Sequence, residues 1–233
     1  MIFERNALIE AMMDFDDPDF ELAISFFRRA GVDLQDEGFP LEKWCLEQAE
    51  RGKPEAQHAI AKLFQSGIFG NPDQVAAYRW CSRAVESGYV PALHMLAGLE
   101  VDQEKSIELF EAAARLDYAP ALVALATTYL TEDFLRAREY LERAVALGDS
   151  VAEIILGNLL IENSVPSETI RGLRLIEASA FQGNATAHGI LSNLYAAKRF
   201  GIPVDLAKST FHRHEAEVIK STRNERLRPY SPM

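Results

Sequence analysis

The chain has 233 residues and a formal net charge of −11 at pH 7, with 48% hydrophobic and 25% charged residues. This composition is typical of a globular protein with one large or two modest domains, and it excludes a disordered chain. The negative charge counts against nucleic acid as the main partner, because that backbone is bound by clustered Lys and Arg. No apolar run reaches the roughly 18 residues of a spanning helix, and the start lacks a secretory pattern. We therefore expect a cytoplasmic protein with no membrane partner.

The first 39 residues predict two helices that do not follow the pattern of the rest of the chain. Residues 2–15 carry a broad apolar stripe, and residues 16–31 begin with acids and Pro18 and end at Gly31. We interpret residues 1–39 as an N-terminal helical cap, with a partner-specific docking element as the alternative. The acidic run lacks the central glycine and the correctly spaced bidentate Glu of a calcium loop, so helix capping explains it better. Its carboxylates either form a solvated face or bind a basic partner. The candidate partner-binding residues in this run are Asp14, Asp16, Asp17 and Asp19.

From residue 40 onward the sequence repeats. An alanine is followed four residues later by a large aliphatic residue and five residues later by a small one, as at Ala56, Ile60 and Ala61. The small residue allows two helices to approach closely. Spacings between 29 and 36 residues indicate a solenoid of helical hairpins, and a plain tetratricopeptide array, with its stricter period, fits less well. The five alanines are Ala56, Ala92, Ala121, Ala152 and Ala187.

A second register marks the second helix of each hairpin. An acidic residue is expected to cap that helix by accepting hydrogen bonds from free backbone N–H groups. A residue suited to a left-handed conformation follows about fifteen residues later and ends the helix. The predicted caps are Asp73, Asp102, Asp133 and Glu168, and the predicted ends are Gly88, Asp117, Gly148 and Gly183.

These motifs resemble the Sel-one-like repeat family, which belongs to the tetratricopeptide-like superfamily. The fullest copy begins at Ala56 and ends at Gly88, and the resemblance covers about residues 40–218. It implies an all-α, right-handed superhelical solenoid of about five stacked antiparallel helix pairs. The last copy has Val204 where the capping acid is expected, so we expect it to end the stack, with residues 219–233 as a polar tail. The second and third copies have lost the long loop inside the hairpin, so the middle loops should be the shortest.

Neither the cysteines nor the histidines form a recognisable reactive motif. Cys45 and Cys81 hold the same place in neighbouring copies, where equivalent atoms are too far apart for a disulfide, so buried thiols are expected. His58 and His94 are also equivalent, but no histidine pair has helical metal-site spacing. We expect no cofactor, no metal site and no enzyme activity, although a cryptic metal-dependent hydrolase is the least favoured alternative.

The family resemblance implies a bacterial scaffold or adaptor that binds another protein or peptide, and it leaves the oligomeric state open. First helices are expected to line the concave face, so their polar residues outside the core positions are candidate partner contacts. An ordinary solvated helix face is the alternative for each of them. A second functional hypothesis is an immunity protein that neutralises a basic toxin. The candidate contacts are Gln57, Lys62, Glu153, Asn158, His188 and Asn193.

Overall fold

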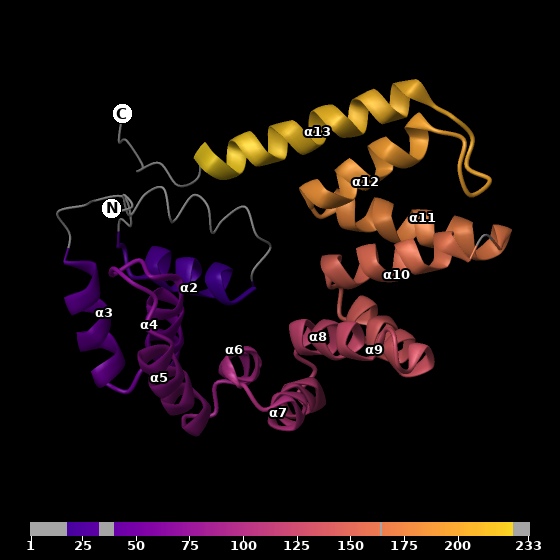
Figure 1. Ribbon diagram of the computed structural model, residues 1–233. Helices are drawn as coiled ribbons and strands as arrows, with labels where there is room; N and C mark the ends of the chain where they lie inside the picture. Colours follow the sequence, from indigo (N-terminus) through magenta and orange to yellow (C-terminus); the bar gives the residue numbers. More distant parts are fainter. Residues whose placement is uncertain (1–17, 33–39, 164, 226–233) are drawn as a thin grey trace. The chain divides into compact units, whose positions relative to one another are not determined.

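The structure, a computed structural model, describes residues 18–32, 40–163 and 165–225 (Figure 1). Within these ranges the regular elements are α-helices, apart from an isolated bridge between Arg199 and Ile202. The predicted all-α solenoid of paired helices is confirmed. The helices are α2 (Pro18–Arg29), α3 (Leu41–Glu50), α4 (Pro54–Ser66), α5 (Gln74–Glu86), α6 (Val90–Leu99), α7 (Gln103–Arg115), α8 (Ala119–Tyr129), α9 (Phe134–Ala146), α10 (Ser150–Glu162), α11 (Pro166–Phe181), α12 (Ala185–Ala196) and α13 (Leu206–Glu225).

The described chain divides into two compact units. Unit 1 contains α2 to α7, and unit 2 contains α8 to α13 as far as Thr222. In both units a loop joins each first helix to the second helix of the same hairpin. The pairs are α4 with α5 and α6 with α7 in unit 1, then α8 with α9, α10 with α11 and α12 with α13 in unit 2.

Three of the four predicted acidic caps are confirmed. The side chains of Asp73 and Asp133 accept hydrogen bonds from the backbone N–H groups of Ala76 and Arg136, at 2.8 and 3.1 Å. Asp102 accepts from two N–H groups in the same way. Each carboxylate satisfies a donor that the first helical turn leaves without an intrahelical partner.

The structure corrects the predictions for Glu168 and Val204. Helix α11 begins at Pro166, whose missing N–H suits a first helical position, so Glu168 lies inside the first turn and is not the cap. In the last copy Asp205, one residue beyond Val204, accepts a hydrogen bond from the Lys208 N–H at 3.0 Å. The capping acid is therefore present but shifted by one position. Helix α13 continues past residue 219 and ends at Glu225.

The predicted helix ends and loop lengths agree with the structure. Gly88, Gly148 and Gly183 have φ between 77° and 84°, and Asp117 adopts the left-handed conformation as well, with φ 53°. The loops at 100–102 and 130–133 are short, whereas those at 67–73 and 197–205 are long. The lost glycine-rich loop of the second and third copies accounts for this difference.

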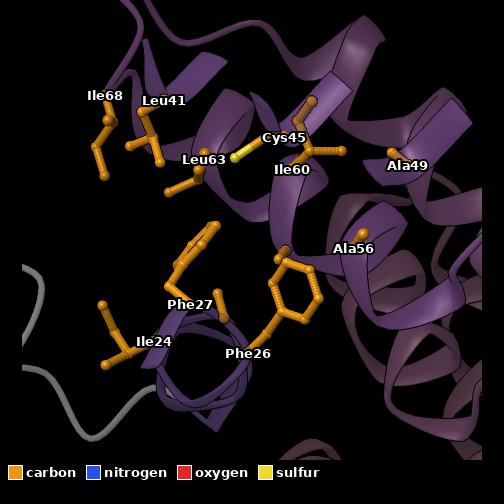
Figure 2. Packing of buried hydrophobic residues seen from close by; sticks show 12 residues of the cluster. Ile24, Phe26, Phe27, Leu41, Cys45, Ala49, Ala56, Ile60, Leu63 and Ile68 are labelled. Carbon is orange, nitrogen blue, oxygen red and sulfur yellow. The ribbon is translucent and has the colours of Figure 1, made fainter. Parts of the chain in front are cut away.

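The core consists of the repeating small and aliphatic positions. Ala56, Ala92, Ala121, Ala152 and Ala187 are all buried. In unit 1 a large cluster joins α2, α3 and α4, with Phe26 and Phe27 of α2 pointing towards side chains of α3 and α4 (Figure 2). Helix α2 thus contributes its aromatic side chains to the core of the first hairpin.

Candidate protein-binding face

Polar side chains on the first helices form the candidate face. We define the first-helix face of unit 1 as Gln57, His58 and Lys62 of α4 and His94 of α6. In unit 2 the corresponding polar positions are Glu153, Asn158, His188 and Asn193, on α10 and α12.

A buried carboxylate lies on the first-helix face of unit 1. Asp19, in the first turn of α2, is 5% exposed. His58 Nε2 lies 3.0 Å from Asp19 Oδ1, and His94 Nδ1 lies 3.1 Å from Oδ2. Burial alone would raise the pKa of Asp19, but the hydrogen bonds and positive potential of the two imidazoles outweigh it and lower that pKa below its usual range. Asp19 is therefore a carboxylate that accepts from both rings.

Aromatic rings fix the orientation of both imidazoles. His58 meets the ring of Tyr89 edge-on at a centroid distance of 5.4 Å. His94 lies between Phe110 and Tyr118, at 5.5 and 5.7 Å. Because these neighbours belong to α7 and to the segments at the ends of hairpins, the hairpin stack itself positions the two N–H donors.

Gln57 and Lys62 are buried rather than presented to solvent. Gln57 Nε2 donates to the Ala49 carbonyl at 3.2 Å, and Lys62 Nζ donates to Gln65 Oε1 at 2.9 Å. Both side chains are less than 8% exposed. A partner would have to displace neighbouring side chains to reach them.

The face of unit 2 contains two buried polar groups and two accessible ones. Glu153 accepts from Gln182 Nε2 at 2.9 Å, and burial together with nearby Asp149 raises the pKa of Glu153. His188 is also buried. Asn158 is half-buried and Asn193 is exposed, so they are the two predicted contacts that solvent can reach.

His188 and His212 form a hydrogen-bonded imidazole pair between α12 and α13. Their Nδ1 atoms are 3.0 Å apart, and His188 Nε2 lies 3.2 Å from the Ala180 carbonyl, which can only accept. Neutral His188 therefore carries its proton on Nε2 and accepts from His212 Nδ1. Burial and the neighbouring His188 lower the pKa of His212.

The two cysteines are free and buried, as predicted. Burial raises the pKa of each thiol to about 12, and Cys81 Sγ donates to the Ala92 carbonyl at 3.1 Å. Within the described ranges no three His, Cys, Asp or Glu side chains are grouped to hold a metal ion. Nor is any helix found there that is long and apolar enough to cross a membrane.

The outer side of unit 2 carries ion pairs between successive second helices. Glu142 of α9 pairs with Arg171 of α11, and Arg138 reaches Glu168 at 3.5 Å. Beside them lies a surface hollow of about 650 Å³, lined by Leu135, Arg138, Glu139, Glu142 and Arg143. The charges in this hollow are mixed and are already paired with one another in part.

The acidic N-terminal candidates divide into two groups. Asp14, Asp16 and Asp17 lie outside the described residues. Asp19 does not belong to a solvated acidic face, because two histidines from distant parts of the chain enclose it. The sequence signal that could have found this cluster is the equivalence of His58 and His94 in successive copies.

The helical hairpins, each with small buried residues at the same positions of its first helix, define an α/α-repeat protein. The family model described as Sel1 repeat matches residues 16–31, 54–89, 92–118 and 124–149. The chain belongs to the Sel1 repeat family, as its resemblance to the Sel-one-like repeats indicated. The first matched segment includes α2, although residues 1–39 lack the alanine register of the later copies.

Several solved structures share the fold. The chain is similar to a Sel1 repeat protein from Oxalobacter formigenes, with a TM-score of 0.70 and 22% identity over 90% of this chain and 91% of that one. It is also similar to the immunity proteins Pa5087 and PA5088 from Pseudomonas aeruginosa. Their TM-scores are 0.67 and 0.68 and their identities 19% and 17%, over 93% of this chain and 89% of each of theirs. A comparison with curated proteins found no match.

Proposed function

We propose that this protein is a non-enzymatic scaffold that binds another protein on its first-helix face. Sel1 repeat proteins generally mediate protein–protein interactions. The observation that carries the proposal is that a helix, α2, already lies on this face in unit 1, where Asp19 contacts α4 and α6. A face that accommodates one helix has the shape and the hydrogen-bond donors to accommodate polypeptide.

In unit 2 the accessible part of this face centres on Asn158 and Asn193. We propose that a partner contacts these two amides, in the cytoplasm. The net charge of −11 would steer a basic partner towards the protein and raise the association rate. A basic partner should therefore bind more slowly at high salt.

The test compares Asn193→Arg with Gln74→Arg, which places the same side chain on an exposed position of the second helix α5. Proteins captured by the tagged full-length chain are identified, produced in pure form and titrated against all three versions. We expect Asn193→Arg to weaken binding at least tenfold and Gln74→Arg to leave it unchanged. Equal loss in both variants, or no loss in either, would contradict binding at this face.

A second candidate function is toxin neutralisation. It is favoured by the likeness to two proteins that are themselves described as immunity proteins. Under this hypothesis the partner is a toxin encoded beside the gene for this chain. Co-expression should restore growth of cells that produce the toxin, and the two purified proteins should form a complex; persistent toxicity at matched expression would exclude this function.

A further inference from the structure

Among the described helices, the first helix α4 packs extensively against three others, whereas the first helices α6 and α10 each pack extensively against two. It packs against its hairpin partner α5 and against the preceding second helix α3, as α6 packs against α7 and α5 and as α10 packs against α11 and α9. In addition, α4 packs extensively against α2. Among the described helices, α2 therefore covers a first helix that also packs against its hairpin partner and against the preceding second helix.

Two kinds of contact hold α2 in this place. Ile24, Phe26 and Phe27, which are labelled in Figure 2, form an apolar cluster with α3 and α4. Ala23 belongs to the same cluster. At the other end of α2, Asp19 accepts hydrogen bonds from His58 and His94. The carboxylate precedes the two aromatic residues by seven and eight positions, or about two helical turns, so one face of α2 carries both features.

The two histidines form what we call the imidazole clamp, and only the first two copies have it. Because an ionised carboxylate can only accept, both rings donate: His58 through Nε2 and His94 through Nδ1. The equivalent positions in the third, fourth and fifth copies are Val123, Ile154 and Gly189. These residues have no side-chain donor, so the repeated histidine is found only in the first two copies.

The imidazole clamp also bears on which helix can occupy this site. Removing a carboxylate from water is costly, and well-packed apolar residues in its place often stabilise a protein equally or better. A buried acid enclosed by two donors instead dictates which helix can dock there and in which register, because a helix without the acid would leave both N–H groups unsatisfied.

We propose that the first-helix face of unit 1 binds an amphipathic helix of a partner protein, one that presents a carboxylate to the imidazole clamp and two adjacent aromatic rings two turns later. Helix α2 is the chain's own occupant of this site, and the partner helix displaces it. The proposal rests on the proposed function, since it names the kind of partner. It adds that α2 covers the site until it is displaced. The imidazole clamp then rejects partner helices that lack the acid.

The tether gives α2 a large advantage over a free competitor. A segment joined by a short connection competes at an effective concentration on the order of millimolar. A free helix at micromolar concentration should therefore not enter the site while α2 is held by the imidazole clamp. Weakening the contact of α2 with the clamp should open the site.

The experiment uses the full-length chain and a fluorescent peptide with the sequence of residues 18–32. Fluorescence anisotropy measures peptide binding to the wild type and to Asp19→Ala, in which the internal helix has lost its acid. We expect no binding to the wild type at micromolar concentrations and at least tenfold tighter binding to Asp19→Ala. A second peptide with alanine at the position of Asp19 should bind Asp19→Ala at least tenfold more weakly than the first.

His94→Ala provides a second variant if Asp19→Ala does not fold, because alanine has no side-chain donor and the position is only half-buried. It should reduce the preference between the two peptides, and hydrogen exchange should report faster exchange in α2. The proposal is overturned if a folded variant binds neither peptide, or if both peptides bind equally. Neither result affects partner binding through Asn193, so failure of the proposed function is observed separately.

Discussion

Gly157 of α10 and Gly172 of α11 lie against each other so closely that neither position has room for a side chain. A Cβ atom on Gly172 would lie 2.5 Å from the carbonyl oxygen of Gly157, and one on Gly157 would lie 2.9 Å from that of Gly172. Both contacts are with backbone atoms, which cannot rotate away. The small residue expected in the repeat is thus essential to this hairpin.

The first prediction concerns this close contact. Gly172→Ala should lower the free energy of unfolding by about 1–3 kcal/mol, because the new methyl group forces the two backbones apart. Gly189→Ala is the matched control: it lies in α12 with no atom within 4 Å of its Cβ position. Higher helix propensity should make that variant about 0.5–1 kcal/mol more stable. Urea titrations that shift both midpoints in the same direction would contradict the contact.

The second prediction concerns pH and His212. Its pKa in the folded protein lies below the ordinary value of 6.5, so at pH values below 6.5 the unfolded chain binds more protons than the folded one. The stability that this group contributes is complete above pH 6.5 and is lost as the pH falls through the lowered pKa. His212→Gln should therefore flatten the dependence of urea midpoints on pH between 7 and 5. An unchanged pH dependence of the urea midpoints in this variant would contradict the lowered pKa of His212.

The third prediction concerns the caps of the second helices. Asp133→Ala removes the side chain that accepts from the Arg136 N–H, so it should cost about 1 kcal/mol of stability. Glu132→Ala removes the same charge from the exposed neighbouring position and should change stability by less than about 0.5 kcal/mol. Thermal unfolding of the two variants measures the difference. Equal losses would mean that charge, and not the cap, is responsible.

The fourth prediction concerns thiol reactivity. Because burial raises the pKa of Cys45 and Cys81 to about 12, very little thiolate is present at pH 8. A chromogenic disulfide reagent should react with neither thiol on the timescale of minutes in the native protein. Both thiols should react at once in denaturant. Rapid reaction of either thiol in the folded state would show that the packing around its helix opens readily.

Local rules predicted most of the fold. Each helix cap depends on a side chain that contacts the backbone two or three residues later, as at Asp73, Asp102 and Asp133. The left-handed turn at Asp117 depends on the conformation of that residue itself. Such features can be predicted from sequence because the interacting atoms are close along the chain. The Glu168 prediction was wrong because Pro166, two residues earlier, is a stronger helix start in this context.

The candidate site was harder to predict because it depends on distant residues. Asp19 is 39 residues from His58 and 75 from His94. In the sequence it stands in an acidic run and resembles a solvent-facing charge. Its burial follows from the packing of Phe26 and Phe27 on α4, which places the first turn of α2 against two successive hairpins. Only the three-dimensional arrangement brings one carboxylate to two equivalent histidines.

The link from Asp19 to both α4 and α6 also bears on how the array unfolds. In a linear array each repeat is stabilised by its immediate neighbours, and a terminal repeat, having one neighbour, frays first. A side chain that contacts two consecutive hairpins at once makes them melt together instead of one after the other. The N-terminal end of the array should therefore lose its structure in a single cooperative step, and repeats further along the chain could open while this end stays intact.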